Sequence, residues 1–229
     1  MYHGGMVRYD KSGGESLTDR AYGALKQMIT TLELPPGGLV NEEGLQERLG
    51  IGRTPIREAL QRLEREQLVS VLPRRGIFVT AVDPADLPML CESRAMIEAY
   101  AARLAALRGS EADWDEMDAL LASVGDVSEA GELMSVDRRC HEVVWAASGN
   151  PFLTGTLDML YTQSDRLWHL YLSDIEFVHD AIAEHRTIAD ALRHGDDELV
   201  GTLSEQHVRH FEQAVRAAIG RRLESPLAG

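Results

Sequence analysis

Two arginines one helical turn apart follow a Gly-Ile-Gly turn in the stretch GIGRTPIREALQRLEREQLV, residues 50–69. Proline suits the first helical position and a preceding threonine can cap free amide groups, so the Thr54-Pro55 pair predicts an abrupt helix start. Arg53 and Arg57 then lie at the positive end of that helix, where the helix dipole disfavours cations. We therefore interpret the two arginines as ligands for an anionic partner.

A second group of residues could bind a metal ion. Asp137 and His141 are four residues apart and share one face of a predicted helix, while His185 and His207 lie on two later helices. Three imidazoles and a carboxylate suit Zn²⁺, with Ni²⁺ or Mn²⁺ as alternatives. The chain has eight histidines, so an Asp/His pair at this spacing is expected by chance. From spacing alone, solvated or core histidines remain the alternative.

The N-terminal third of the chain has the pattern of a winged helix. Apolar residues recur at helical spacing from residue 17 to about 34, and LPPGG then ends that helix. Asn41 is a suitable cap for a second, short helix, which Gly50 ends before the helix that carries the arginines. Two β-rich runs around Pro-Arg-Arg-Gly then predict a hairpin. Three helices and a hairpin make a winged helix-turn-helix.

This arrangement predicts how DNA is read. The second helix of a helix-turn-helix enters the major groove by its N-terminal end, where Arg53, Thr54 and Arg57 lie. Arginine can donate to both O6 and N7 of guanine, and Thr54 with the free amides suits a phosphate. In the hairpin, Arg74, Arg75 and Gly76 are expected to reach the adjacent groove or backbone. The alternative is that the arginines are solvated and pair with Glu58 or Glu64.

The remainder of the chain predicts an all-α domain of six or seven antiparallel helices, with breaks near Gly109, Gly125, Gly149, Ser173 and Gly195. The fold class is thus mainly α. We expect five parts: a flexible tail (1–15), the winged helix (16–81), a linker (82–86), a helical effector-binding and dimerisation domain (87–222) and a C-terminal tail (223–229).

Charge divides along the same boundary. Residues 1–80 contain 11 Arg and Lys against 10 Asp and Glu, whereas residues 81–229 contain 12 against 27. Residues 48–75 alone contain seven arginines and three glutamates, the basic patch expected of a DNA-binding module. No apolar run is long enough to cross a membrane, and two cysteines, Cys91 and Cys140, form no CxxC pair. These features predict a cytoplasmic protein.

The stretch from residue 34 to 79, with its RTPIREAL core and downstream RGIFV, resembles the winged helix of the GntR family of bacterial transcription regulators. The resemblance implies that Arg53, Thr54 and Arg57 face operator bases and phosphates, and that Gly76 approaches the minor groove. The sequence departs from the family at Gly52, where serine is usual. The loss of that serine removes one phosphate donor.

The second domain resembles the ligand-binding domain of the FadR-like branch of the same family, through ESRAMIEAYAARLAA, DRRCHEVVWAASGNPFL and EHRTIADALRHGD. The resemblance implies a divalent metal held by Asp137, His141, His185 and His207, with a carboxylate effector completing its coordination. It also implies that Arg94 faces the effector cavity, although an i,i+4 pair with Glu98 is the alternative. Arg166 is a second candidate for effector binding. Cys140 replaces the usual phenylalanine, which could reshape the pocket or offer a sulfur.

These observations predict a homodimeric transcriptional repressor, not an enzyme, which binds a palindromic operator and responds to a small carboxylate. One winged helix reads too few base pairs for useful specificity, so a symmetric dimer is expected. Two alternatives stay open. In the first, the metal ion itself is the signal. In the second, the site activates water as a hydrolytic enzyme.

Overall fold

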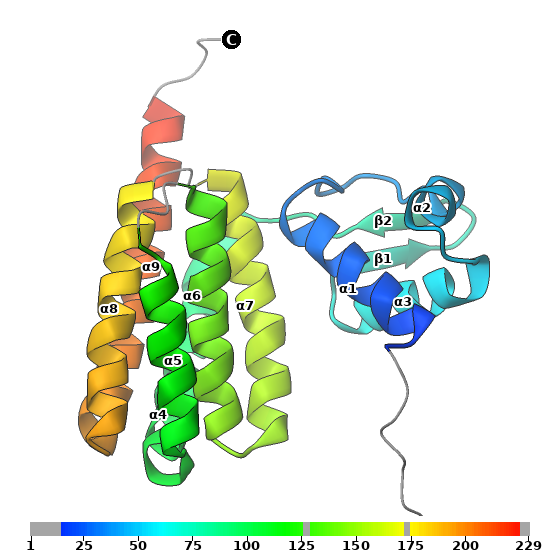
Figure 1. The fold of residues 1–229 in the computed structure, drawn as a ribbon. Coiled ribbons are helices and arrows are strands. Elements are labelled where there is room, and N and C mark those ends of the chain that lie inside the picture. Colours follow the sequence, from blue (N-terminus) through cyan, green and yellow to red (C-terminus); the bar gives the residue numbers. More distant parts are fainter. Residues whose placement is uncertain (1–14, 126–128, 172–174, 225–229) are drawn as a thin grey trace, which may run out of the picture. The chain divides into compact units, whose positions relative to one another are not determined.

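The computed structural model describes residues 15–125, 129–171 and 175–224. The chain divides into two compact units, residues 1–81 and residues 82–229. Figure 1 shows a small helical unit with a hairpin and a larger bundle of helices. No helix in the described ranges is long and apolar enough to cross a membrane.

The first unit has three helices and a hairpin: α1 (Leu17–Thr30), α2 (Glu42–Leu49), α3 (Arg53–Arg65), β1 (Val69–Leu72) and β2 (Gly76–Val79). Its core is formed by the apolar faces of α1 and α3, which include Leu25, Ile29, Ile56, Leu60 and Leu63. The strands pair antiparallel, with Val69 opposite Val79 and Leu72 opposite Gly76. The predicted winged helix is thus confirmed.

Local caps fix the turn between α2 and α3. The Asn41 side chain accepts a hydrogen bond from the Gly44 amide at 3.1 Å, which satisfies a free amide at the start of α2. Gly50 ends α2 with φ of 63°, a left-handed conformation that glycine adopts without strain. These two residues have the roles predicted from the sequence, and they set where α3 begins.

The second unit is a bundle of six α-helices within the described residues. They are α4 (Leu87–Arg108), α5 (Glu111–Ser123), α6 (Ala130–Ala147), α7 (Pro151–Tyr171), α8 (Ile175–Arg193) and α9 (Asp197–Glu224). Helix α4 packs against α6, α7, α8 and α9, and α6 packs against α5, α7 and α8. Short connections between successive helices favour antiparallel neighbours. The mainly α fold class is confirmed.

The junction and the tails differ in detail from the expected boundaries. The segment expected as a linker includes a single 3₁₀ turn, Pro84–Asp86, whose start is capped by the Asp83 side chain. Helix α9 continues to Glu224, two residues into the segment expected as a tail. The predicted break at Ser173 lies outside the described residues, as do residues 1–14 and 225–229 of the two predicted tails.

The end of α4 gives a test of the bundle's packing. A Cβ atom at Gly109 would lie 2.4 Å from Cζ2 of the buried Trp114 ring and 2.8 Å from the Ala105 carbonyl oxygen. Replacing Gly109 by alanine should therefore lower the free energy of unfolding by about 1–3 kcal/mol. All three tryptophans of the chain lie in the second unit, so urea unfolding followed by tryptophan fluorescence measures this unit.

Gly155 is the matched control, because it lies inside α7 with no atom within 4 Å of an added Cβ. Gly155→Ala should raise the free energy of unfolding by about 0.5–1 kcal/mol through helix propensity alone. A Gly109→Ala variant as stable as Gly155→Ala would contradict this packing.

Candidate DNA-reading surface and candidate metal centre

Helix α3 presents its first turn to solvent. It begins at Arg53, with Gly52 as N-cap and no side-chain hydrogen bond to the cap. The expectation that Thr54 caps the helix is therefore wrong, because Thr54 already lies inside the first turn. Arg53, Thr54 and Arg57 are all exposed, at the end of the helix where backbone amides are free.

Arg57 is held by an ion pair that joins the two helices of the turn. Its Nε donates to Oε2 of Glu42 at 2.7 Å, and its side chain remains half exposed. The partner is Glu42 of α2 and not Glu58 or Glu64, the partners considered from the sequence. The hydrogen bond from Arg57 lowers the pKa of Glu42, and the charge of Arg53 contributes to the shift. The pair orients a guanidinium group at the surface of the turn.

The hairpin turn exposes two further arginines. Arg74 has φ of 64°, Gly76 has φ of 108°, and the Arg75 amide closes the turn on the Leu72 carbonyl at 3.0 Å. A Cβ atom at Gly76 would lie 2.9 Å from Leu39 Cδ1, so glycine is needed here for the turn itself. Arg74 and Arg75 are exposed on this wing.

Two other arginines of the basic patch also have partners within the first unit. Arg48 pairs with Glu33, and Arg62 pairs with Asp19 while its guanidinium stacks 3.6 Å from the centre of the Tyr22 ring. Their charges are thereby explained without DNA. Arg53, Arg57, Arg74 and Arg75 stay the candidates for DNA contact, because they lie exposed at the start of α3 and on the wing.

The second unit brings four potential metal ligands together in its interior. Asp137 and His141 come from α6, His185 from α8 and His207 from α9, and all four are buried. One ligand atom of each lies within 4.8 Å of those of the others. The Nε2 atom of His185 is 2.9 Å from Asp137 Oδ1, and that of His207 is 3.8 Å from the same oxygen. The set predicted from the sequence thus converges in space.

Two imidazole nitrogens in this cluster lie too close to be left without a proton or a cation between them. The Nε2 atoms of His141 and His207 are 3.1 Å apart, and their lone pairs would otherwise repel. One ion with bonds of about 2.1 Å to both nitrogens would hold them about 3.0 Å apart at an octahedral angle and about 3.4 Å apart at a tetrahedral angle. The spacing and the chemistry of the donor set therefore fit a divalent metal ion.

Carboxylates outside the cluster fix two of the imidazole rings. His141 Nδ1 is 2.8 Å from Glu98 Oε2, and His207 Nδ1 is 2.7 Å from Glu184 Oε2. Each contact uses the ring nitrogen that faces away from the cluster, so each leaves Nε2 directed inward, as in carboxylate-histidine-metal arrangements. Neither contact was predicted from the sequence. The pair Glu184-His185 was visible, but the partner of Glu184 lies on another helix.

The remaining contacts stabilise the buried charge of Asp137. The Tyr161 hydroxyl donates to Asp137 Oδ2 at 2.7 Å. Burial alone would raise the pKa of Asp137, but the hydrogen bond and charge of His185 outweigh it and hold that pKa far below its usual range. Burial lowers the pKa of His185 to about 4. Burial also opposes the charged form of His207, but the hydrogen bond that its Nδ1 donates to Glu184 and the charge of Asp137 raise its pKa.

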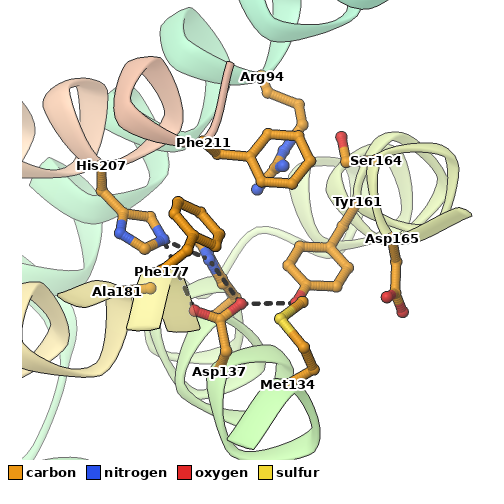
Figure 2. Close-up of a pocket in the computed structure, with 11 residues that line it drawn as sticks. Arg94, Met134, Asp137, Tyr161, Ser164, Asp165, Phe177, Ala181, His207 and Phe211 are labelled. Carbon is orange, nitrogen blue, oxygen red and sulfur yellow. Dashed lines mark hydrogen bonds and ion pairs between the residues drawn. The ribbon is translucent and has the colours of Figure 1, made fainter. Parts of the chain in front are cut away.

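A cavity of about 340 Å³, including its open mouth, lies next to the cluster. Figure 2 shows Arg94 on one side of it and Asp137 with His207 on the other. Arg94 Nε donates to Glu98 Oε1 at 2.7 Å, and no hydrogen bond to a described residue is made by its two terminal nitrogens. Both sequence interpretations of Arg94 therefore agree with its position: it pairs with Glu98 and it lines the cavity.

Other residues singled out from the sequence lie away from this cavity. Arg166 is fully buried on α7, donates to Gln163 and is not among the residues that line the cavity. Cys140 belongs to the hydrophobic core, and burial raises the pKa of its thiol to about 12. These positions supply no contact for an effector in this cavity.

Each of the two units matches a known family of protein domains. The family model "Bacterial regulatory proteins, gntR family" matches residues 17–79, and the FCD domain model matches residues 89–210. An HTH-type transcriptional regulator from an unstable DNA locus of Streptomyces ambofaciens is 32% identical, over 82% of this chain and 80% of its own.

Two further comparisons cover most of the chain. The HTH-type transcriptional repressor GlaR of Escherichia coli is 27% identical, over 82% of this chain and 90% of its own. The solved structure of E. coli McbR/YncC has the same fold, with a TM-score of 0.79 and 23% identity over 90% of this chain and 99% of its own.

The pKa of His185 predicts how acid affects the second unit after treatment with a chelator. A histidine that burial keeps neutral contributes stability above its unfolded pKa of about 6.5, and that stability is lost as pH falls toward 4. Between pH 7 and pH 5, the wild type should lose roughly 2 kcal/mol relative to His185→Gln, which cannot take up this proton. Urea unfolding followed by tryptophan fluorescence measures the difference.

The histidine that serves as control is His179, which is exposed on the same helix. His179→Gln should follow the wild type across this pH range. We expect the free energy of unfolding of wild type minus that of His185→Gln to fall between pH 7 and pH 5. If this quantity stays constant or rises, His185 is not buried in its neutral form.

Proposed function

The chain belongs to the GntR family of bacterial regulatory proteins and carries an FCD domain, so it is a DNA-binding transcriptional regulator, and we propose that it is a metal-dependent repressor. In this proposal a small carboxylate binds beside the metal ion and weakens operator binding. The convergence of Asp137, His141, His185 and His207 beside the cavity carries the proposal. The family and its relatives point to a regulator, in contrast to the hydrolytic enzyme considered from the ligands alone.

The four converging residues would hold the divalent ion. Three neutral imidazoles and one carboxylate suit Zn²⁺, and Ni²⁺ or Mn²⁺ have compatible preferences. A bound ion would supply a Lewis-acidic site for an effector oxygen. Because the ligands come from α6, α8 and α9, metal binding would also hold these three helices in one arrangement.

Arg94 is the residue we propose to bind the effector carboxylate. Its guanidinium is 3% exposed, lies 5.0 Å from the Tyr161 ring centre and 5.6 Å from that of Phe211, and keeps its two terminal nitrogens for a ligand. Two parallel N–H groups match a carboxylate, and the aromatic walls strengthen the contact by excluding water. Arg166, the second candidate from the sequence, lacks a comparable position on the cavity.

We propose a homodimer formed through the outer face of α4. Four large apolar side chains on this helix are each more than half exposed: Met89, Met96, Tyr100 and Leu107. Their spacing of seven, four and seven residues aligns them in one stripe along the helix. A second copy of the chain is the partner that a palindromic operator requires, and the same stripe on that copy is self-complementary about a two-fold axis.

The proposal also includes a repressor role and a cytoplasmic location. A 27% identical relative is named a repressor, which supports the same sign of regulation here. Operator DNA lies in the bacterial cytoplasm, where we expect the protein to act. A metal-responsive regulator is the second candidate, because ligands from three helices could make the ion itself the signal. Tight retention of metal during dialysis would favour the carboxylate sensor over it.

Metal analysis tests the centre of the proposal. Reconstituted wild type should carry about one divalent ion per chain, and His185→Ala combined with His207→Ala should carry none. Glu184→Gln should weaken metal binding about 10–100-fold, since it removes the carboxylate that orients His207. Affinity should fall as pH drops below about 6.5, because protonated imidazoles cannot ligate.

Equilibrium dialysis against Zn²⁺ followed by elemental analysis provides the measurement. Glu205→Gln is the matched control, because this α9 carboxylate pairs with Arg209 at the surface. A wild type that takes up no metal and still binds a carboxylate with unchanged affinity would rule out the metal-dependent site.

DNA binding tests the arginines of α3. Arg53→Ala and Arg57→Ala should each cost about 1–3 kcal/mol on an operator selected from a random-sequence library, with a smaller loss on random DNA. Arg65→Ala removes the same charge from the other end of α3 and should affect both DNAs alike. Equal losses on both DNAs for Arg53→Ala and Arg57→Ala would show that the two side chains only hold phosphates.

A further inference from the structure

The cavity beside the metal centre has a second charged wall that the proposed function does not use. Asp165 on α7 lines the same cavity as Arg94, and its side chain is 11% exposed. Its Oδ1 atom is buried and accepts no hydrogen bond from any described residue. A carboxylate oxygen left in this state lacks the donor that buried acceptors normally have.

The groups around Asp165 do not supply that donor. His169, one turn further along α7, has Nε2 at 3.4 Å from Oδ1 but without the alignment of a hydrogen bond, and burial lowers its pKa. Arg138 and Arg94 act on Asp165 only through their charge, while Asp137 repels it. Burial raises the pKa of Asp165 to about 7, as expected for a carboxylate short of donors.

One cavity therefore combines a guanidinium with two available nitrogens and a carboxylate with an unsatisfied oxygen (Figure 2). We propose that Asp165 is a specificity residue that accepts a hydrogen bond from a hydroxyl or ammonium group of the effector. The effector is then a hydroxy acid or an amino acid, whose carboxylate binds on the Arg94 and metal side. This inference rests on the proposed function and narrows its ligand class.

The discrimination follows from the cost of desolvation. A plain fatty acid would place hydrocarbon against Asp165 and seal its oxygen from water without a donor. A site built to hydrogen-bond a ligand group rejects the analogue that lacks it, because the site's own polar group is left unpaired. A hydroxyl or ammonium group in reach of Asp165 removes that penalty.

Ligands of equal length test the inference on the full-length, zinc-loaded chain. The probes are butanoate, its 2-, 3- and 4-hydroxy derivatives, and its 2- and 4-amino derivatives, each titrated by calorimetry. Wild type should bind at least one substituted acid ten-fold or more tighter than butanoate. In Asp165→Ala this ratio should fall to within about two-fold, mainly through weaker binding of the substituted acid.

Two further variants are needed. One distinguishes a hydroxyl donor on the ligand from an ammonium donor, and the other controls for the loss of a negative charge. Asp165→Asn is nearly isosteric and keeps an accepting oxygen, so it should retain a preference for a hydroxy acid and lose one for an ammonium group. Asp180→Asn removes one exposed carboxylate from α8 and should leave all affinities unchanged. Circular dichroism checks that each variant is folded.

The outcomes distinguish this inference from the function on which it rests. If Arg94→Gln loses butanoate but wild type shows no preference for a substituted acid, the carboxylate site stands and the role of Asp165 is refuted. A preference that persists unchanged in Asp165→Ala refutes it equally. If wild type binds no member of the series, or Arg94→Gln binds butanoate as wild type does, the proposed effector site itself fails.

Discussion

The buried carboxylate of Asp137 is the group around which the second unit is organised. An ionised carboxylate is expensive to bury unless charges and hydrogen bonds compensate it. Here the compensation comes from His185 on α8, the Tyr161 hydroxyl on α7 and the nearby rings of His141 and His207. Four helices thus supply groups to one charge. Their packing and the ionisation of the cluster cannot vary independently.

Helix α4 joins the buried cluster to the cavity wall and to an exposed apolar stripe. Glu98 accepts from Arg94 through Oε1 and contacts His141 through Oε2, so one buried carboxylate joins an arginine of the cavity wall to the histidine cluster. Its neighbours hold the pKa of Glu98 at about 2 against the effect of burial, which keeps the carboxylate charged. The same helix carries the exposed apolar stripe on its outer face and begins just after the junction with the first unit. A ligand bound to Arg94 would therefore act directly on α4, the helix that carries both Glu98 and the apolar stripe.

The sequence predicted features that depend on local chemistry, and it failed where contacts join distant segments. Asn41 and Gly50 could be assigned because a cap depends on the residue type at a helix end. Thr54 was misassigned because the helix begins two residues earlier than the Thr-Pro pair indicates, with Gly52 as N-cap and no side-chain cap. The four candidate ligands that the resemblance implied do converge in space. Glu184 and Asp165 have no sequence signal, since each has meaning only through a ring or cavity formed by other helices.

The energies involved suggest how modest the regulatory motion needs to be. Coupling between two sites in regulated proteins is typically about 1–3 kcal/mol, and one arginine that reads a guanine contributes a similar amount of discrimination. In our proposal DNA replaces Glu42 as the partner of Arg57, so binding would exchange one ionic contact for another instead of desolvating a free cation. An effector that disturbs one such contact in each half of a dimer would change operator occupancy substantially without unfolding either unit.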